Sequence, residues 1–251
     1  MFDLSGRVVV VTGGNTGIGL GLARGVATAG AAVAVWARNE ERNASAVAEL
    51  QALGVGALGV RCDVTDEAQV DDAMARTVAH FGKVDVLFAN SGVTGDAAFV
   101  DMSLEEWRRV LCVNVDGSFL ALRAAARHLV ARGQGGSLVA VSSTVALHGA
   151  PRREHYAASK CAVIGLIRSL AVELARHRVR ANALLPGWTD TELLADAKAY
   201  QRFVDNTVAR TPVRRWASPD EFAEAAVFLA DPTLTFHTGD CLVVDGGYTV
   251  F

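Results

Sequence analysis

Tyr156 and Lys160 are the residues of this sequence whose types and spacing most directly indicate chemistry. They lie four residues apart in a helical pattern, which places both side chains on one helix face, one turn apart. Such a pair is common and usually structural, but Ser143, thirteen residues before Tyr156, adds a hydroxyl at the end of an apolar run. A phenol with a pKa of about 10 is a poor base at neutral pH, and a neighbouring ammonium favours its phenolate. Ser143 can then hydrogen-bond a substrate oxygen while Tyr156 exchanges a proton with it, which is acid–base chemistry for a carbonyl/alcohol couple.

The stretch TGGNTGIG, residues 12–19, places three glycines between an apolar run and a helical pattern. A tight turn needs one or two glycines, whereas Gly13, Gly17 and Gly19 together indicate close approach of the backbone to a phosphate. Their spacing differs from the GxGxxG of the common dinucleotide fingerprint, although the glycines can serve the same turn and the same pyrophosphate contact. On this stretch alone, a glycine-rich turn without a ligand stays an open alternative.

Short β-branched runs alternate with longer alanine-rich amphipathic stretches along the chain. The runs are apolar throughout, which is typical of parallel strands covered on both faces, and the stretches between them are long enough for right-handed crossover helices. We therefore predict an α/β fold, a Rossmann-like, doubly wound, parallel seven-stranded sheet with helices on both faces, in a single domain over residues 1–251. The predicted strands are 8–12, 32–37, 58–62, 84–89, 137–142, 178–185 and 242–246, and the predicted helices are 17–29, 40–53, 66–80, 104–131, 155–176 and 218–230.

The composition limits the classes of partner. A formal net charge of −3 over 251 residues gives no electrostatic reason to expect nucleic acid or an anionic membrane surface. No apolar run approaches the roughly 18 residues of a membrane span, and residues 1–7 lack the regions of a signal peptide. The cysteines form no CxxC pair and the histidines show no metal spacing, so we expect reduced thiols, no metal site and a surface position for His155. These features predict a cytoplasmic protein.

Six motifs follow one another along the chain: TGxxxGxG, ANSG, LCVNVDG, Ser-x12-Tyr-x3-Lys, PGxxxT and VDGG. In this order they resemble the short-chain dehydrogenase/reductase family over essentially the whole chain. The resemblance implies an NAD(P) cofactor, hydride transfer between a ketone and a secondary alcohol, and the strand order 3-2-1-4-5-6-7. It also implies a catalytic tetrad of Asn114, Ser143, Tyr156 and Lys160.

Each member of the implied tetrad has a role in the family. Tyr156 is the implied acid/base, and Ser143 orients and polarises the substrate oxygen. Lys160 is implied to hold the nicotinamide ribose and, together with the cationic nicotinamide ring, to lower the tyrosine pKa. Asn114 is implied to hold a water that relays protons through Lys160, although taken alone it can also be a cap or turn residue.

The resemblance also implies the residues that bind the dinucleotide. The glycine turn holds the pyrophosphate, Asp63 at the end of the third strand hydrogen-bonds the adenine amino group, and PGxxxT contacts the carboxamide and a phosphate. Taken alone, Asp63 can also be a helix N-cap. Ala89 replaces the first Asn of the family's NNAG motif, which puts local rigidity in doubt more than activity. The implied cofactor-binding residues are Gly13, Asn15, Thr16, Gly17, Ile18, Gly19, Arg38, Asn39, Asp63, Val64, Asn90, Gly92, Tyr156, Lys160, Pro186, Gly187, Thr189 and Thr191.

The choice between the two dinucleotides depends on the end of the second strand. A protein that selects NAD usually places a carboxylate there, about 20 residues past the glycines, and this chain has Ala37 followed by Arg38. A guanidinium suits phosphate geometry, so we predict a modest preference for NADP(H), with NAD possible. Thr16 stands where many NADP users have a second basic residue, and Arg38 can instead pair with Glu40, Glu41 or another acid.

The segment 188–212 is polar and mixed, breaks the alternation of strands and helices, and is predicted to be a substrate lid. Arg152 and Arg153 can recruit an anionic substrate at the rim of the site, or they can belong to a solvated loop paired with Glu154. The sequence does not identify the substrate, which can be a 3-oxoacyl thioester, a sugar or sugar acid, or a small cyclic or aromatic ketone. The predicted substrate contacts are Thr144, Arg152, Arg153 and Trp188.

Two other function classes share this fold. A Rossmann protein that senses a dinucleotide without turnover is the principal alternative, but such proteins typically lack the Tyr/Lys pair. An epimerase or lyase usually has a longer substrate domain after the sheet. The family expectation for assembly is a homotetramer, or a dimer, formed by helices 104–131 and 155–176 with the C-terminal segment. The sequence offers some support, because the helix after Lys160 is apolar around much of its circumference.

Overall fold

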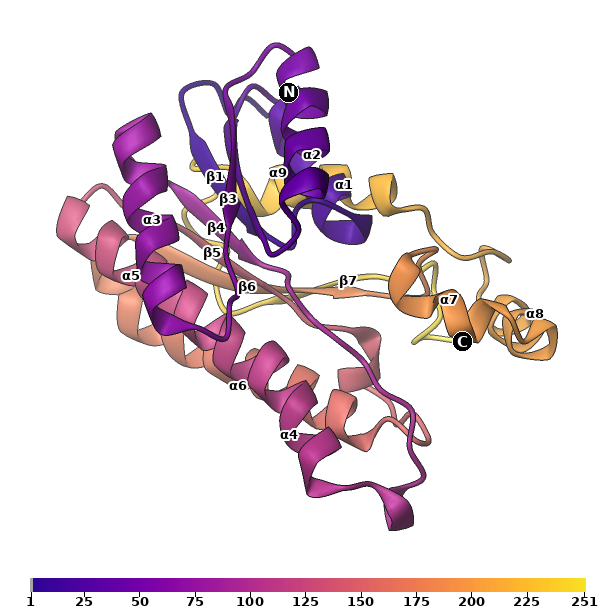
Figure 1. Cartoon of the computed structure of the whole chain (residues 1–251). Helices are drawn as coiled ribbons and strands as arrows, with labels where there is room; N and C mark the ends of the chain where they lie inside the picture. The colour runs from indigo at the N-terminus through magenta and orange to yellow at the C-terminus, as the bar shows by residue number, and fades with distance from the viewer. Residues whose placement is uncertain (1) are drawn as a thin grey trace.

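The computed structural model describes residues 2–251 and contains one parallel sheet with helices on both of its faces (Figure 1). The strand order is β3-β2-β1-β4-β5-β6-β7, and every neighbouring pair is parallel, so the predicted fold is confirmed. The strands are β1 (Val8–Thr12), β2 (Ala32–Ala37), β3 (Ala57–Arg61), β4 (Val86–Ala89), β5 (Gly136–Val141), β6 (Val179–Pro186) and β7 (Cys241–Val244). The helices are α1 (Gly17–Thr28), α2 (Glu40–Ala52), α3 (Glu67–Phe81), α4 (Leu104–Leu111), α5 (Gly117–Arg132), α6 (Glu154–Leu174), α7 (Ala195–Lys198), α8 (Gln201–Arg210) and α9 (Ala223–Ala230).

Successive side chains of β1 point to opposite faces of the sheet, and both faces are covered by helices, which explains why this strand is apolar throughout. Val8 and Val10 belong to the core between the sheet and helices α3, α5 and α6. Val9 and Val11 point to the opposite face and pack in the core with α1, α2 and α9. All four valines are less than 5 % exposed, so each contributes about 1.5–3 kcal/mol of burial. Two helical layers therefore cover both faces of the central strands, whereas β7 at the edge of the sheet stays partly exposed.

The predicted helix 104–131 is interrupted in the structure. α4 ends at Leu111, a π-helical turn spans Cys112–Asp116, and α5 begins at Gly117. The Gly117 N–H donates to the carbonyl of Cys112, five residues back, so the helix is locally widened. Such π-turns are frequent at functional sites, and this one contains Asn114.

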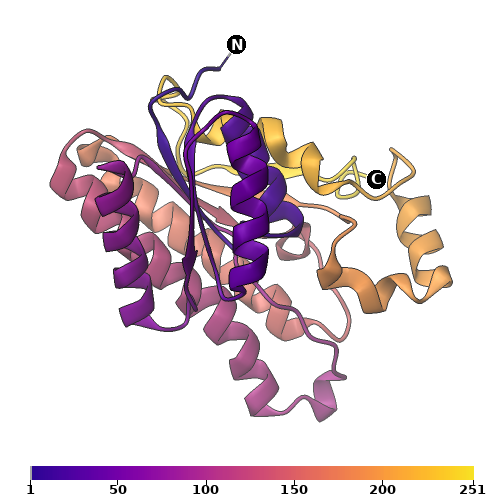
Figure 2. The same ribbon diagram turned by 45° about the horizontal axis from the view of Figure 1, so that its top comes forward.

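The segment 188–212 extends beyond the carboxyl ends of the strands (Figure 1 and Figure 2). It contains a short 3₁₀ turn at Glu192–Leu194, followed by α7 and α8. The indole of Trp188 stacks on that of Trp216, with 5.9 Å between ring centroids, and the ring of Phe203 meets Trp188 edge-on at 5.1 Å. These aromatic contacts join the segment to the chain that follows it.

Within residues 2–251, no helix is both long enough and apolar enough to cross a membrane. The four cysteines are free thiols, and only Cys62 is fully buried. Nor does this described part of the chain contain a group of three His, Cys, Asp or Glu side chains that could hold a metal ion.

Candidate active site

The carboxyl ends of the strands open into a cleft of about 780 Å³. Of the site residues predicted from the sequence, all except Asn114 and Arg152 line this cleft. The topology explains the convergence, because parallel strands place all their carboxyl ends at one edge of the sheet, where the order reverses on either side of β1. The structure therefore brings together residues that the sequence separates by as many as 178 positions, from Gly13 to Thr191.

The glycine turn is shaped to accept an anion. Gly13 and Gly17 have φ angles of 63° and 52°, in the left-handed region that glycine adopts without strain. A Cβ on Gly19 would lie 2.2 Å from the Gly13 carbonyl oxygen, so that position can hold only glycine. Thr16 is the N-cap of α1 but makes no side-chain capping bond, and the first turn of α1 contains no acid. The first N–H groups of α1 therefore lack a capping side chain, and the pyrophosphate of a dinucleotide fits this end of the helix.

Asn90 holds the glycine turn to β4. Its Nδ2 donates to the carbonyls of Thr12 and Gly13 at 2.9 and 3.3 Å, and its backbone N–H donates to the Thr12 hydroxyl at 3.0 Å. These bonds supply the local rigidity that the replacement of the family's first Asn by Ala89 had put in doubt. Ala89 itself is a buried residue of β4.

Asn114 lies behind the cleft in the π-turn and is 1 % exposed. Its Oδ1 accepts the Val93 N–H at 2.8 Å, and its Nδ2 donates to the Val93 carbonyl and the Ser159 hydroxyl, both at 2.9 Å. A Cβ on Gly92 would lie 3.3 Å from Asn114 Oδ1 and 3.4 Å from Lys160 Nζ, so both polar groups flank the same glycine. Asn114 therefore joins the loop after β4 to helix α6, and the water relay expected of it stays a prediction.

Ser143, Tyr156 and Lys160 meet at the floor of the cleft. Lys160 Nζ lies 5.5 Å from the centroid of the Tyr156 ring and donates to the Val141 carbonyl at 2.9 Å. Burial lowers the pKa of Lys160 to about 8. Burial also raises the pKa of Tyr156, against the hydrogen bond with Ser143 and the charge of Arg153, which lower it. Burial thus outweighs these two groups, and the lowering of the Tyr156 pKa by Lys160 together with the nicotinamide ring stays a prediction.

Arg38 and Asp63 face each other across the adenine side of the cleft. Arg38 Nη1 lies 3.9 Å from Asp63 Oδ2, and the arginine side chain is 74 % exposed. Asp63 Oδ1 accepts the N–H and the hydroxyl of Thr65. The N-cap of α3 is Asp66, which accepts the N–H groups of Ala68 and Gln69, so the N-cap alternative for Asp63 is wrong.

A second arginine at this side was missed by the sequence analysis. Arg42 lies in the first turn of α2, lines the cleft, and places Nη1 2.7 Å from Oε2 of Glu192. Asn39 caps the same helix by accepting the Arg42 N–H. The available signal was a second arginine four residues after Arg38, in the short stretch that leads from β2 into α2.

The PGxxxT stretch closes the cleft opposite the glycine turn. Thr189 is 2 % exposed and its hydroxyl donates to the Gly187 carbonyl at 3.0 Å. A Cβ on Gly187 would lie 2.7 Å from the Cα of Asp245, so the backbone can pass β7 closely only at a glycine. A Cβ on Gly17 would lie 3.3 Å from the methyl group of Thr191, which places Thr191 beside the start of α1.

The two adjacent arginines before Tyr156 separate in the structure. Arg152 has a φ of 66° and pairs with Asp96 at 2.8 Å outside the cleft lining. Arg153 lines the cleft, and no Asp or Glu of residues 2–251 pairs with it at ion-pair distance. Glu154 contacts this loop through a backbone hydrogen bond rather than an ion pair: the Arg152 N–H donates to Glu154 Oε1 at 3.2 Å.

Two histidines near Tyr156 differ from expectation. His155 is fully buried, and its Nε2 lies 3.2 Å from Oε1 of Glu106, so the predicted surface position is wrong. The helix turns this side chain towards α4, where Glu106 provides a partner. His148 lines the cleft, and its Nε2 is buried without a hydrogen-bond partner among the described residues. Periodicity in the sequence does not indicate His148, because this residue lies in an irregular loop after a 3₁₀ turn.

Comparison with known proteins agrees with this geometry. Residues 13–249 match the profile of the family described as enoyl-(acyl carrier protein) reductase. The chain is 42 % identical to L-rhamnose 1-dehydrogenase (NAD(P)(+)) of Sphingomonas sp. strain SKA58, with 98 % of each chain covered. It is 37 % identical to gluconate 5-dehydrogenase of Gluconobacter oxydans strain 621H, covering 100 % of this chain and 97 % of the relative.

A solved structure shows the same architecture. The gluconate 5-dehydrogenase of Burkholderia cenocepacia J2315, in complex with NADP and tartrate, superposes with a TM-score of 0.95 at 38 % identity, covering 100 % of this chain and 98 % of the other. The sequence match and the structural match both extend over the glycine turn and the Ser143–Tyr156–Lys160 floor. The chain therefore belongs to the short-chain dehydrogenase/reductase family of NAD(P)-dependent oxidoreductases.

Proposed function

We propose that this protein interconverts a ketone and a secondary alcohol on a sugar or sugar acid, with NADP(H) preferred over NAD(H). The observation that carries the proposal is the convergence of Ser143, Tyr156 and Lys160 in a cleft whose other end is an uncapped helix N-terminus. A proton donor and a phosphate cradle in one cleft are what a dinucleotide-dependent ketone reduction requires.

The chemical step divides between the protein and its cofactor. When bound, the nicotinamide dinucleotide supplies or accepts the hydride. Ser143 donates a hydrogen bond to the substrate oxygen, and Tyr156 gives its proton to that oxygen as alkoxide charge develops. In the reverse direction Tyr156 takes the alcohol proton. Lys160, held by the Val141 carbonyl, places a positive charge beside the phenol and next to Gly92, where it can hold the nicotinamide ribose.

The preference for NADP(H) rests on the charges at the end of β2. Ala37 and Arg38 line the cleft there, and the ribose that follows a glycine turn lies at this strand end in Rossmann folds. Asp63 is the acid nearest to Arg38, and at 3.9 Å the pair is loose and exposed, so it competes weakly with a phosphate. A relative that was solved in complex with NADP supports this preference, and another is named for NAD(P)(+), which covers either dinucleotide.

Three features of the other end of the cleft support an oxygen-rich substrate. Arg153 supplies a cation without an acidic partner, and His148 supplies a buried ring nitrogen without a hydrogen-bond partner within residues 2–251. Trp188 supplies an aromatic side chain to the lining, and Thr144 also lines the cleft. A polyhydroxylated substrate satisfies the histidine, and its carboxylate, where present, satisfies the arginine. We propose that the 188–212 segment closes over this end as a lid.

We also propose a cytoplasmic homotetramer. The free cysteines support a reducing compartment. Assembly is supported by an apolar groove between α5 and α6. Two exposed apolar side chains add to this support, Val172 on α6 at 82 % exposure and Phe251 at the C-terminus at 69 %. Light scattering at micromolar concentration should give four subunits, and a monomer would contradict the assembly. The groove is lined by Phe119, Leu122, Ala126, Val130, Leu166 and Leu170 among others.

The decisive test is Tyr156→Phe, assayed by nicotinamide absorbance with a panel of sugars, sugar acids and cyclic ketones. The ring remains and only the transferable proton is lost, so kcat should fall by at least about a hundredfold, while dinucleotide affinity stays nearly unchanged. A variant that keeps a tenth of the wild-type kcat would rule out the acid/base role. Dinucleotide binding without turnover on any substrate, in the wild type as in the variant, would favour the sensor alternative.

A further inference from the structure

We infer that Arg42 forms, with Arg38, a two-guanidinium subsite for the 2′-phosphate of the dinucleotide, and that Glu192 occupies this subsite until the phosphate displaces it. The inference rests on the proposed preference for NADP(H) and assigns it a second residue. Thr16 leaves the glycine turn without the basic residue that many NADP users have there, so Arg38 alone would otherwise have to select the phosphate.

The position of Arg42 meets the requirements of such a subsite. Arg38 follows β2, Arg42 lies in the first turn of α2, and both residues line the cleft together with Asn15 and Thr16. Asn15 donates through Nδ2 to Asn43 Oδ1 at 2.8 Å, so it is held against α2. A phosphate near the end of β2 therefore meets two cations at the start of α2, where Asn39 caps the helix and the acids Glu40 and Glu41 stand in its first turn.

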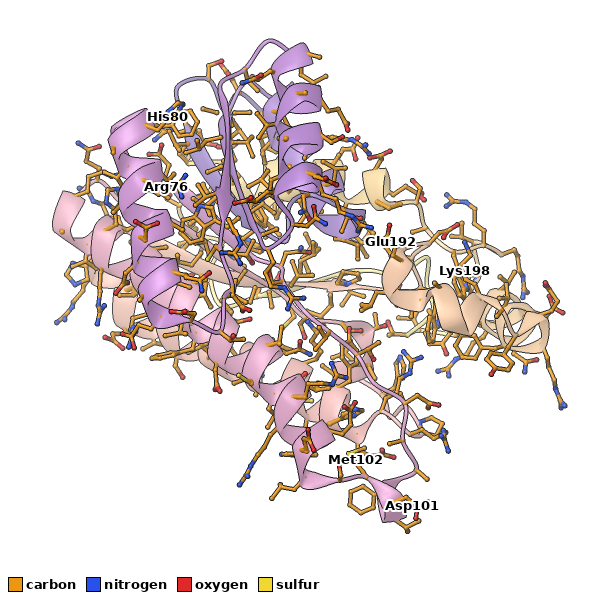
Figure 3. All side chains as sticks on the ribbon, viewed as in Figure 1. Arg76, His80, Asp101, Met102, Glu192 and Lys198 are labelled. Atoms are coloured by element: carbon orange, nitrogen blue, oxygen red, sulfur yellow. The ribbon has the colours of Figure 1, made fainter. Side chains whose placement is uncertain are left out.

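The contact with Glu192 indicates what Arg42 is arranged to hold. Arg42 Nη1 lies 2.7 Å from Glu192 Oε2, an ion pair that crosses the mouth of the cleft from α2 to the 188–212 segment. Figure 3 labels Glu192 on the side of that segment nearer to α2 and Lys198 farther out on it. A carboxylate and a phosphate present similar oxygen geometry to a guanidinium. Both arginines of the subsite are thus paired with carboxylates, Asp63 at 3.9 Å and Glu192 at 2.7 Å.

Competition between the two anions favours the phosphate. The side chains of Arg42 and Glu192 are 49 % and 67 % exposed, so their pair is screened by solvent and is weak. A 2′-phosphate has up to two negative charges and can contact both guanidinium groups, whereas Glu192 has one charge and contacts Arg42 alone. NAD lacks this group and leaves the pair intact. The exchange therefore adds selectivity for NADP(H) without requiring a basic residue at position 16.

Binding of adenosine fragments isolates this subsite from the chemistry. We would measure the dissociation constants of 2′,5′-ADP and 5′-AMP by titration calorimetry for the wild type, Arg38→Ala, Arg42→Gln and Glu192→Gln. Asp190→Asn is the matched control, because Asp190 forms the other ion pair of this segment, with Lys198, away from Arg42. Arg42→Gln should weaken 2′,5′-ADP binding about tenfold, the low end for a charge-assisted hydrogen bond at an exposed site. It should leave 5′-AMP binding within about twofold.

Glu192→Gln gives the opposite result if Glu192 is a competitor. It should tighten 2′,5′-ADP binding by roughly threefold, with 5′-AMP unchanged, because the Arg42 guanidinium loses its carboxylate. If Arg42 and Glu192 instead only hold the cleft closed, both substitutions will weaken both fragments, and the inference fails. It also fails if 2′,5′-ADP binds more tightly than 5′-AMP and only Arg38→Ala reduces the difference. Equal binding of the two fragments to the wild type would instead refute the proposed NADP(H) preference.

Discussion

The buried positive charge of Lys160 should lower the stability of the folded protein. Its side chain is 5 % exposed, and burial lowers its pKa from the ordinary 10.5 to about 8. At about 1.36 kcal/mol per pKa unit, this difference means that charged Lys160 destabilises the folded chain by about 3 kcal/mol below pH 8. The hydrogen bond from Nζ to the Val141 carbonyl offsets about 1 kcal/mol of this. Lys160→Met should therefore be inactive and more stable than the wild type by about 2 kcal/mol at pH 7.

The pH dependence identifies the cause. The folded pKa of Lys160 lies below its unfolded value, so the unfolded chain binds more protons between pH 8 and 10.5, and wild-type stability attributable to this group rises over that interval. The advantage of Lys160→Met should accordingly be constant below pH 8 and should shrink towards pH 10.5. Tyr156 titrates in both proteins and largely cancels in the difference. Urea unfolding at one protein concentration, from pH 7 to 10, measures the two curves.

Lys198→Met is the matched control. Lys198 is exposed and pairs with Asp190, so its removal should change stability by no more than about 0.5 kcal/mol at every pH. A Lys160→Met variant that is less stable than the wild type at pH 7 would refute the reasoning. So would an advantage that does not change with pH, because that result would assign the effect to packing rather than to a buried charge.

Two further variants test other charges. Asp85 is 3 % exposed, and although burial raises the pKa of Asp85, its bonds with the Val8 N–H, Lys83 and Arg132 hold it below the ordinary value of 3.8. Asp85→Asn should lower the free energy of unfolding by about 3 kcal/mol at pH 7. The difference in stability between variant and wild type should diminish as the pH falls below 3.8 through the pKa of folded Asp85. Equal urea midpoints of the two proteins at pH 7 would contradict this. Arg153→Ala should raise KM about tenfold for a sugar acid at low salt and leave KM for a neutral polyol nearly unchanged; equal effects on the two substrates would count against a carboxylate contact.

The order of elements was readable from the sequence because it depends on local periodicity. Apolar runs such as Val8–Val11 are typical of buried parallel strands, and the amphipathic stretches between them require crossover helices. The glycine turn and the Tyr156–Lys160 pair were also predictable, since backbone conformation and helix spacing act within a few residues. Each of these features depends on residues close together in the sequence, so it can be predicted without knowing where the rest of the chain lies.

The tertiary structure decided what depends on distant neighbours. The Asn114 amide bonds to the backbone of Val93, twenty-one residues away, and helical periodicity in the sequence indicates neither that contact nor the π-turn that contains Asn114. Burial, a property of the whole cleft, raises the pKa of Tyr156, and no spacing of residues in the sequence indicates it. The pairing of Arg42 with Glu192 joins residues 150 positions apart. Desolvation and long-range pairing depend on what surrounds a side chain, so a linear pattern of residue types cannot determine them.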